Sequence, residues 1–376
     1  MLRKFLYFSL FFTFIGCTQN QSNIAINKTK LKENKMQTIL NDIIDNEEIF
    51  GTSFCIKDKN RSWCGASGNM QNETQYFIAS TTKLYTTAMV LILKSEGKLS
   101  LDDTIDKYLD KNTLLGLHQL DGKDYSLKIT IKNLLAHTSG LPDYFQQKDN
   151  KGVSLEDKVI AGEDQFWSFN EIIKYGKGLE SKFIPSSPNN AFYSDTNYQL
   201  LGKIIENITH LSYAKSLEIL ITKPLKLQKT YLYTDIKDNR PISLYYENKP
   251  LIIPKAMTSF GADGGIVSTS KEMQVFTEAF FSAKLFPKGY LAELYQWNDL
   301  FSPLQSGVGV HRIKLPWIFN LFMKSPELYG HSGLSGALTF YNPKDDIYIS
   351  GSVNQIANPS ASYKTLFKLI GAFNEK

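Results

Sequence analysis

The sequence lacks several features that mark common classes of hydrolase. It contains three cysteines in 376 residues, and their spacing predicts no zinc-type metal site. It contains no His-Glu-x-x-His motif, which places two zinc ligands on one helix in many metalloproteases. It also has no Gly-x-Ser-x-Gly elbow, so an α/β-hydrolase is not expected. We therefore expect neither a metal ion nor another cofactor.

The sequence also has little excess charge and few long apolar runs. The formal net charge is +5, from 42 basic and 37 acidic residues, and the lysines are scattered along the chain. This excess is too small to favour nucleic acid or an anionic membrane surface as a partner. No apolar run after the N-terminal segment is long enough to span a bilayer. With 42% hydrophobic residues the chain can bury a large core, in one large domain or two interlocked ones.

The N-terminal segment has the pattern of a secretory signal. A basic start, Met1-Leu-Arg-Lys, precedes a short apolar run from Phe5 to Ile15, which predicts a signal peptide over residues 1–16. The sequence Phe14-Ile-Gly-Cys17 resembles the lipobox of bacterial lipoproteins, although Phe14 departs from the usual aliphatic residue. We expect Cys17 to be lipidated and residues 17–35 to form a flexible tether, because residues 18–35 show no apolar period. An ordinary cleaved signal with an incidental cysteine is the alternative.

These features predict a location in the cell envelope, with the protein lipid-anchored to a membrane and facing the periplasm or the exterior. Residues 36–376 would then form the folded domain. It opens with an amphipathic helix, because five apolar residues lie on one helical face: Met36, Ile39, Leu40, Ile43 and Ile44.

A hairpin is expected after this helix, from Thr52 to Gly65, with a two-residue loop at Lys59-Asn60. In that register Cys55 and Cys64 lie opposite each other on neighbouring strands. Export to an oxidising compartment favours a disulfide between them. Two buried free cysteines are the alternative.

The stretch with the clearest chemistry is Tyr76-Phe-Ile-Ala-Ser80-Thr-Thr-Lys83, which runs into an apolar segment ending at Leu93. Residues at i and i+3 share a helix face, so Ser80 and Lys83 would point into the same space. The helix N-terminus and burial both favour a neutral lysine, which can take the serine proton. The N–H of Ser80 can stabilise an oxyanion. The spacing therefore suits acyl transfer.

The Ser-x-x-Lys pattern alone is weak, because it occurs three more times, at Ser95-Lys98, Ser212-Lys215 and Ser268-Lys271. Only Ser80 begins a segment too apolar for a surface helix. His137, at a helix end before a Gly/Pro turn, suits a hydrogen-bonded structural role better than that of a general base. Residues 145–165 read as an irregular polar insertion that either flanks a substrate cleft or is a surface loop.

Several motifs in order identify a family resemblance. They are Phe77-Ile-Ala-Ser-Thr-Thr-Lys, Glu96-Gly-Lys-Leu-Ser-Leu-Asp-Asp, Leu134-Leu-Ala-His-Thr-Ser-Gly-Leu-Pro, Tyr193-Ser-Asp-Thr-Asn-Tyr, Phe260-Gly-Ala-Asp-Gly-Gly and Gly330-His-Ser-Gly-Leu-Ser-Gly. Together they resemble the β-lactamase-related serine hydrolases, which include class C β-lactamases, D-alanyl-D-alanine carboxypeptidases, D-aminopeptidases and esterases. The resemblance implies an α/β (α+β) fold of the penicillin-binding-protein type. An antiparallel sheet flanked by helices would join early and late strands, with a mostly helical region inserted between them.

The resemblance also implies roles for individual residues. Ser80 would be the nucleophile and Lys83 its base, and Tyr193 would share the proton with them. Asp195 departs from the asparagine common at its position, because a carboxylate accepts hydrogen bonds but donates none. It could bind substrate, pair with Lys83 or cap a helix, and we interpret it as a mark against β-lactamase activity.

The third family element is a Lys-Thr-Gly strand in the β-lactamases and reads His331-Ser332-Gly333 here. By resemblance these residues would contact substrate, and the N–H of Leu334 would complete the oxyanion hole with that of Ser80. Gly333 would let a substrate lie close to the strand. The charge of the His331 imidazole depends on pH, unlike the charge of a lysine at the same position. This weakens the inference that the site recognises a carboxylate.

The predicted function is an exported serine hydrolase that acts through an acyl-enzyme on amide or ester bonds. D-amino-acid-containing peptides or small esters are the expected substrates. A β-lactamase is one alternative, and a non-catalytic relative that binds cell-wall peptides or another protein is the other. Residues 315–323 are unusually apolar and predict either a core hairpin or a lip that touches membrane or substrate.

Overall fold

The computed structural model describes residues 29–314 and 327–375. Its centre is one eight-stranded sheet with the order β10-β11-β12-β13-β14-β15-β1-β2. All of its neighbouring strands pair antiparallel. The strands are β1 (Gly51–Lys57), β2 (Ser62–Gly68), β10 (Asn298–Phe301), β11 (Leu304–Ser306), β12 (His311–Ile313), β13 (Leu328–Ser332), β14 (Ala337–Asn342) and β15 (Ile347–Ser352). The expectation of a sheet joining early and late strands is therefore confirmed.

The predicted signal peptide (residues 1–16), Cys17 and residues 315–323 lie outside the described residues, as does the tether up to residue 28. Residues 29–35, which we assigned to the tether, are helical and continue into the expected helix, which runs to residue 42. The tether prediction is wrong for these seven positions. Once a helix is nucleated, each added residue costs little, and the sequence there consists largely of the good helix formers Lys, Leu and Glu.

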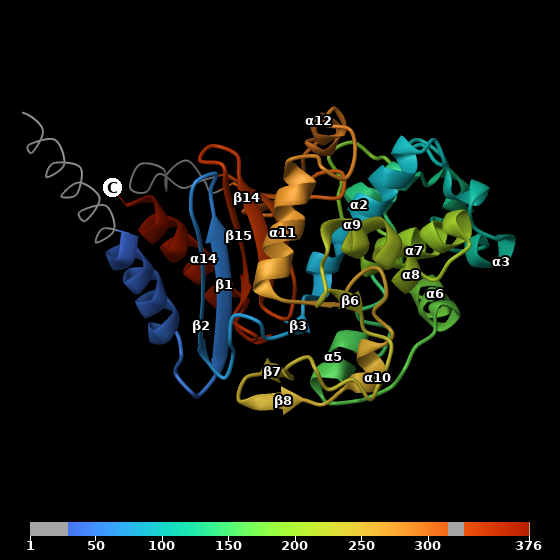
Figure 1. Ribbon diagram of the computed structural model, residues 1–376. Helices are drawn as coiled ribbons and strands as arrows, with labels where there is room; N and C mark the ends of the chain where they lie inside the picture. Colours follow the sequence, from blue (N-terminus) through green and yellow to red (C-terminus); the bar gives the residue numbers. More distant parts are fainter. Residues whose placement is uncertain (1–28, 315–326, 376) are drawn as a thin grey trace, which may run out of the picture.

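Helices cover both faces of the sheet. The helix ending at residue 42 and α14 (Pro359–Asn374) pack on one face, where Met36, Leu40 and Leu366 join a buried apolar cluster with the strands. Helix α11 (Ser270–Phe281) packs on the other face, against β1, β14 and β15 (Figure 1). The sheet is thus the middle of three layers. Helix α11 lies between part of the sheet and the helical region, whereas β13 contacts the start of α2 directly.

The β1–β2 hairpin has the predicted register. Asp58 N–H donates to the carbonyl of Arg61, which closes the two-residue loop at Lys59-Asn60. Cys55 pairs with Cys64 across the strands, and the two form a disulfide with Cα atoms 4.1 Å apart. The disulfide prediction is confirmed.

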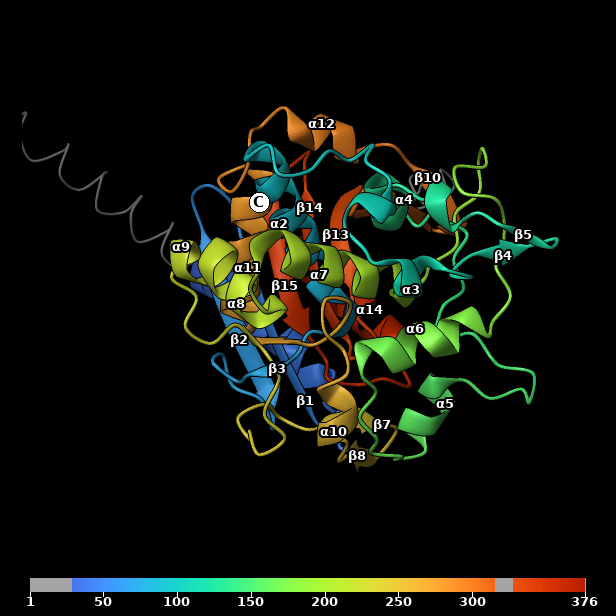
Figure 2. The same ribbon diagram turned by 90° about the vertical axis from the view of Figure 1, so that its right-hand side faces the viewer.

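The helical region is built around α2 (Thr82–Ser95), in which every residue from Thr82 to Leu93 is buried. Helix α7 (Asp195–Thr209) packs against it (Figure 2). Three shorter helices contact α7: α4 (Ile131–Ala136), α6 (Phe169–Lys177) and α8 (Tyr213–Leu217). The remaining short helices are α3 (Lys111–Leu114), α5 (Leu155–Ile160), α9 (Lys223–Leu225), α10 (Pro254–Met257) and α12 (Tyr290–Leu294). Across the two described ranges, we find no helix with the length and apolar character needed to cross a bilayer.

Three small sheets complete the fold. A three-stranded sheet joins β3 (Tyr76–Phe77), β9 (Ile266–Ser268) and β6 (Tyr231–Leu232), and it leads directly into α2. Two hairpins, β4–β5 (Gln119–Leu120, Lys123–Asp124) and β7–β8 (Leu244–Tyr246, Lys249–Leu251), project from the helical side. The insertion expected at residues 145–165 is not wholly irregular, because Ser154 caps α5 within it.

Candidate active site

Ser80 lies in a single 3-10 turn between β3 and α2. Upstream, Ile78 N–H donates to the carbonyl of Ile266 on β9 over 3.0 Å, and downstream Ile266 N–H donates to Thr82 Oγ1 over 3.2 Å. Between these two anchors Ala79 has φ +45°, which is unfavourable for a residue with a Cβ. Backbone strain of this kind collects at functional sites. The turn therefore holds Ser80, which is half-buried, in one orientation.

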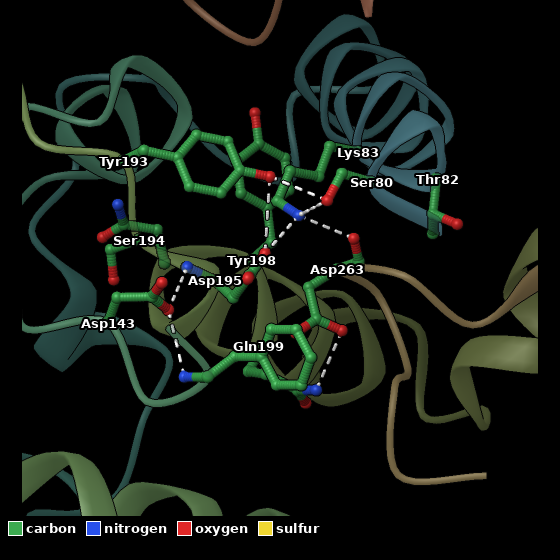
Figure 3. Close-up of polar contacts among 12 residues, drawn as sticks. Ser80, Thr82, Lys83, Asp143, Tyr193, Ser194, Asp195, Tyr198, Gln199 and Asp263 are labelled. Atoms are coloured by element: carbon green, nitrogen blue, oxygen red, sulfur yellow. Dashed lines mark hydrogen bonds and ion pairs between the residues drawn. The ribbon is translucent and has the colours of Figure 1, made fainter. Parts of the chain in front are cut away.

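Lys83 is fully buried and faces Ser80 one helical turn earlier, as the spacing predicts. Its Nζ donates to Ser80 Oγ over 3.0 Å and to the carbonyl of Asp263 over 2.7 Å, and it forms an ion pair with Asp195 (Figure 3). All three hydrogens of the ammonium are therefore used. A neutral lysine, expected from the sequence, stays a prediction.

Tyr193 reaches the same serine from the loop before α7. Its hydroxyl donates to Ser80 Oγ over 2.8 Å. Burial, followed by the negative charge of Asp195, raises the pKa of the Tyr193 phenol well above its ordinary value. Tyr193 is thus a protonated phenol at neutral pH. The structure brings together Ser80, Lys83 and Tyr193, the three residues that the sequence singled out.

Asp195 is the first residue of α7, where the positive end of the helix favours a carboxylate. Of the three roles left open for it, the structure shows the ion pair with Lys83. The helix-capping role is wrong, because Ser194 occupies the N-cap position. The N–H of Asp195 donates to Asp143 Oδ1 over 3.0 Å, so a second carboxylate lies directly behind it.

Two further buried acids, Asp143 and Asp263, were not identified from the sequence. Burial, and then the charge of Asp195, raises the pKa of Asp143 well above its ordinary value. The same two causes, in the same order, raise the pKa of Asp263 to about 7. The Asp263 carboxyl accepts from Tyr144 Oη over 2.6 Å and from the amide of Gln199 over 3.0 Å. Three buried acids, Asp143, Asp195 and Asp263, therefore lie in one cluster with Lys83 on one side of Ser80.

The end of β13 passes close over Ser80. A Cβ placed on Gly333 would lie 2.4 Å from the carbonyl oxygen of Ile78 and 3.0 Å from the nitrogen of Ser80. Only glycine permits this approach. Within the described chain no hydrogen-bond acceptor is recorded for the N–H of Leu334, the residue that follows. The positions of Ser80 and Leu334 thus suit the predicted oxyanion hole, in which two N–H groups point at one oxygen.

The side chains of the two residues before Gly333 both contact other parts of the chain. The hydroxyl of Ser332 accepts from Tyr363 Oη of α14 over 2.6 Å, on the side of the strand away from Ser80. His331 is only 2% exposed, and its Nδ1 donates to the carbonyl of its neighbour over 2.8 Å. Side chains alternate across a strand, so Ser332 faces α14 while His331 faces Tyr193. The substrate-binding role of His331 and Ser332 stays a prediction.

His331 instead belongs to a group of three buried histidines beside Tyr193. The ring of His311 stacks on that of His331 with centroids 4.0 Å apart, and His137 stacks on Tyr193 at 4.6 Å. Burial lowers the pKa of each of the three imidazoles, that of His311 to about 3. His137 has the structural role that its position predicted. Within the described residues no set of three or more His, Cys, Asp or Glu side chains is arranged to hold a metal ion.

A pocket opens beside Ser80 on the side away from the histidines, and we call it the inner pocket. Its apolar walls come from α5, α10, the β7–β8 hairpin and the loop after β13. They are formed by Phe145, Val159, Leu244, Ile253, Met257, Phe260, Leu334 and Ile356, and Asp195 and Asp263 reach its polar end. No lysine, arginine or histidine of the described chain lines it. Residues 145–165 therefore flank the cleft, which was one of their two expected positions.

Comparison with known proteins agrees with this geometry. The family profile described as Beta-lactamase matches residues 36–372. A "Putative D-alanyl-D-alanine carboxypeptidase" of Salmonella enteritidis PT4 is 27% identical over 323 residues, which span 77% of this chain and 72% of that protein.

Solved structures share the fold. A D-stereospecific amidohydrolase from Streptomyces sp. is 24% identical, with a TM-score of 0.75 over 89% of this chain and 98% of its own. A D-amino acid amidase from Ochrobactrum anthropi SV3, complexed with L-phenylalanine, is 21% identical, with a TM-score of 0.74 over 91% of this chain and 98% of its own. EstCE1, "a hydrolase with promiscuous acyltransferase activity", is 18% identical, with a TM-score of 0.76 over 93% and 100%. The expected fold is confirmed, and the chain belongs to the beta-lactamase family of serine hydrolases.

Proposed function

We propose that this hydrolase acts through an acyl-enzyme on Ser80 and cleaves amides or esters of apolar acyl groups, D-aminoacyl groups among them. The main support for the proposal is that two side chains, Lys83 and Tyr193, both contact the hydroxyl oxygen of Ser80. Ser80 Oγ lies 3.0 Å from Lys83 Nζ and 2.8 Å from Tyr193 Oη. Two groups able to move protons therefore meet at a nucleophile that opens onto a pocket.

Each step has a residue in place. Ser80 Oγ bonds to the substrate carbonyl carbon while its proton passes to Lys83, and the N–H groups of Ser80 and Leu334 hold the oxyanion. Because Lys83 is ion-paired with Asp195, its ammonium first passes a proton to that carboxylate, with which it is in direct contact. Tyr193 protonates the leaving nitrogen or oxygen as the carbonyl bond to it breaks. Water then attacks the acyl carbon and gives one proton to the Tyr193 phenolate. The bond from the carbon to Ser80 Oγ breaks, Ser80 regains its proton from Lys83, and Lys83 regains the proton held by Asp195.

The charges of the inner pocket favour an amidase or esterase over a carboxypeptidase or β-lactamase. Substrates of carboxypeptidases and β-lactamases carry a carboxylate, and binding a carboxylate needs a cation or strong hydrogen-bond donors nearby. Here Lys83 is engaged by Asp195, the nearby histidines are held neutral, and the pocket ends in two carboxyl groups. The name of the Salmonella relative keeps D-alanyl-D-alanine carboxypeptidase activity as a second candidate.

Intact mass after a fluorophosphonate probe tests the nucleophile. We expect one adduct on the wild-type protein, none on Ser80→Ala, and slow labelling of Lys83→Ala. Ser95→Ala is the matched control, because Ser95 and Lys98 have the same spacing without the pocket, and it should label like the wild type. A folded wild-type protein that takes no adduct would favour a non-catalytic binding protein.

Substrate class is tested by turnover of three compounds: a D-aromatic amino acid amide, a simple butyrate ester, and an acylated D-alanyl-D-alanine peptide. We expect turnover of the first two and at least about tenfold lower kcat/KM for the peptide, because Lys83 is engaged by Asp195 and is not free to pair with the terminal carboxylate of the leaving D-alanine. Faster release of D-alanine than of either other product would overturn the amidase and esterase assignment. Hydrolysis of penicillin would do the same in favour of a β-lactamase.

We also propose that the protein is exported and anchored to a membrane through lipidated Cys17, facing the periplasm or the exterior. The Cys55–Cys64 disulfide supports an oxidising compartment. The test is to express the full chain and Cys17→Ala and to measure the mass of the N-terminal peptide and the membrane-bound fraction. We expect an acylated peptide and membrane association only for the wild type. Equal membrane association of both forms would contradict the anchor.

A further inference from the structure

A second apolar depression lies next to the inner pocket, and no step proposed above uses it. We call it the outer groove. Its apolar lining consists of Phe77, Tyr233, Ile236, Leu251, Ile252 and Pro254, together with three residues of the wall that divides it from the inner pocket. Lys237, Asp238, Asn239, Pro241 and Ser243 complete the lining. Most of this lining belongs to one continuous segment, residues 233–257, which carries the β7–β8 hairpin and α10. The same segment therefore shapes both cavities.

The dividing wall consists of Leu244, Ile253 and Met257, each of which lines both cavities. Their exposures are 6%, 3% and 5%, so each side chain is packed between the two spaces. Since the same side chains face both cavities, one layer of side chains separates them. Methionine is unbranched and has three rotatable bonds, so Met257 can change rotamer at small cost. The wall is thus thin and contains an adaptable side chain.

The outer groove offers apolar surface that the protein itself leaves uncovered. Ile252 is 67% exposed and Ile236 is 49% exposed, whereas most large apolar residues within 29–314 and 327–375 are buried. Two charged side chains, Lys237 and Asp238, also line the groove, and Asp238 is already paired with Arg240 and accepts from Tyr231 Oη. An apolar ligand would therefore be favoured, with a gain of about fourfold in affinity for each methylene group it buries.

We propose that the inner pocket and the outer groove together hold one linear acyl chain, so that the favoured substrates are esters or amides of medium-length to long unbranched fatty acids. This inference rests on the proposed function at Ser80. The carbonyl carbon would lie at Ser80 Oγ, the first methylene groups in the inner pocket, and the distal ones past Met257 in the outer groove. A linear chain fits because a passage through a single layer of side chains is narrow. Acylation forms the Ser80 ester and releases the alcohol or amine, and water then releases the fatty acid.

The experiment measures kcat/KM for p-nitrophenyl esters from butyrate to dodecanoate, below their micelle concentrations. We expect the wild type to prefer decanoate over butyrate by about tenfold or more, given the affinity gain per methylene. Ile252→Asp places a charge in the outer groove and should lower kcat/KM for decanoate about fivefold or more, with butyrate within about twofold. Ile219→Asp is the matched control, because Ile219 is 42% exposed and lines neither cavity.

The possible outcomes separate this inference from the proposed function. Butyrate turnover that is lost in Ser80→Ala supports the proposed function whatever the chain-length result. With butyrate turned over, a wild type that prefers butyrate to decanoate overturns the inference, as does an equal effect of Ile252→Asp on both esters. Loss of activity toward an aromatic aminoacyl ester alone in Ile252→Asp would assign the outer groove to a peptide side chain and would also overturn it.

Discussion

The imidazole of His137 stacks on the phenol ring of Tyr193, with ring centroids 4.6 Å apart and planes inclined by 25°. His137 ends α4 in a left-handed conformation, at φ +58°. Its Nδ1 accepts the N–H of Ser194 over 3.1 Å and contacts the amide of Asn197 at the same distance. One residue therefore holds both the ring of Tyr193 and the backbone that follows it, which makes it a positioning residue for the active site.

His137→Phe tests this positioning role. The phenyl ring keeps the stack but cannot accept the hydrogen bonds of Ser194 and Asn197. A buried donor without an acceptor costs about 1–3 kcal/mol, so we expect urea unfolding to show a loss of that size. We also expect kcat to fall about tenfold or more with KM little changed, because Tyr193 moves relative to Ser80. Loss of stability with an unchanged kcat would mean that His137 does not position Tyr193.

The charge of Asp195 should set the pH at which Tyr193 ionises. After burial, that charge is the largest cause of the raised pKa of the Tyr193 phenol. Asp195→Asn keeps an oxygen that can accept from Lys83 but removes the charge, so the pKa of Tyr193 should fall. We expect the alkaline limb of the kcat/KM profile to move to lower pH by about one unit. A limb that stays in place would show that Tyr193 does not supply the proton to the leaving group.

The buried histidines should make the fold sensitive to acid. The pKa of His311 is about 3 in the folded protein, because of burial and the charge of Lys83, and about 6.5 when unfolded. Since the unfolded chain binds the proton more strongly, stability is lost as pH falls from about 6.5 toward 3. The neighbours His137 and His331 have lowered pKa values and contribute in the same direction.

His311→Phe should reduce this acid sensitivity. One histidine contributes at most about 1.4 kcal/mol per pH unit to the loss of unfolding free energy. Between about pH 6 and 4 we therefore expect the unfolding free energy of the variant to fall less steeply than that of the wild type. The two slopes should differ by at most about 1.4 kcal/mol per pH unit. Urea unfolding at several pH values measures it. Parallel pH dependence in both proteins would show that His311 is protonated in the folded state.

Asp263 should change the stability of the fold with pH in the direction opposite to that of His311. Its pKa is raised to about 7 in the folded protein, so the folded chain binds the proton more strongly than the unfolded one. This group's contribution therefore falls as pH rises from about 4 to 7 and stays constant above. Asp263→Asn resembles the protonated acid, and its amide can still contact Tyr144 and Gln199. We expect it to be more stable than the wild type at about pH 8, by at most about 4 kcal/mol, and equal near pH 4.

Activity provides the control for Asp263→Asn. Its backbone carbonyl, and not its carboxyl group, accepts from Lys83. Ester hydrolysis should therefore stay within about tenfold of the wild type. A variant that is less stable than the wild type at about pH 8 would show that the fold favours the ionised carboxylate. The pKa of Asp263 would then be lowered on folding and not raised.

The sequence predicted those parts of the site that depend on short spacing or local order. Ser80 and Lys83 point into the same space because they are three positions apart, and the 3-10 turn that holds Ser80 runs directly into α2. Cys55 and Cys64 lie opposite each other because a two-residue loop sets the register of the hairpin. The place of Tyr193 in the site could be predicted only from the order of the family motifs, because no local pattern links it to a serine 113 positions earlier.

Other features could not be predicted because they depend on contacts between distant segments. Asp143 and Asp263 come within range of Asp195 only when the loop after α4 and the loop before β9 fold onto α7. His331 and Ser332 follow the alternation of a strand, but the sequence does not show which face of that strand meets α14 and which meets Tyr193.

The sequence by itself therefore determined the family, through the order of its motifs, and the contact between Ser80 and Lys83 and the hairpin disulfide, through spacing along one or two elements. Only the tertiary structure decided that Asp195 pairs with Lys83, that three histidines are buried as neutral rings, and that an apolar pocket without a cation opens beside Ser80. Protonation states and pocket shape depend on burial and on charges brought together from remote parts of the chain, and these exist only once the core has formed.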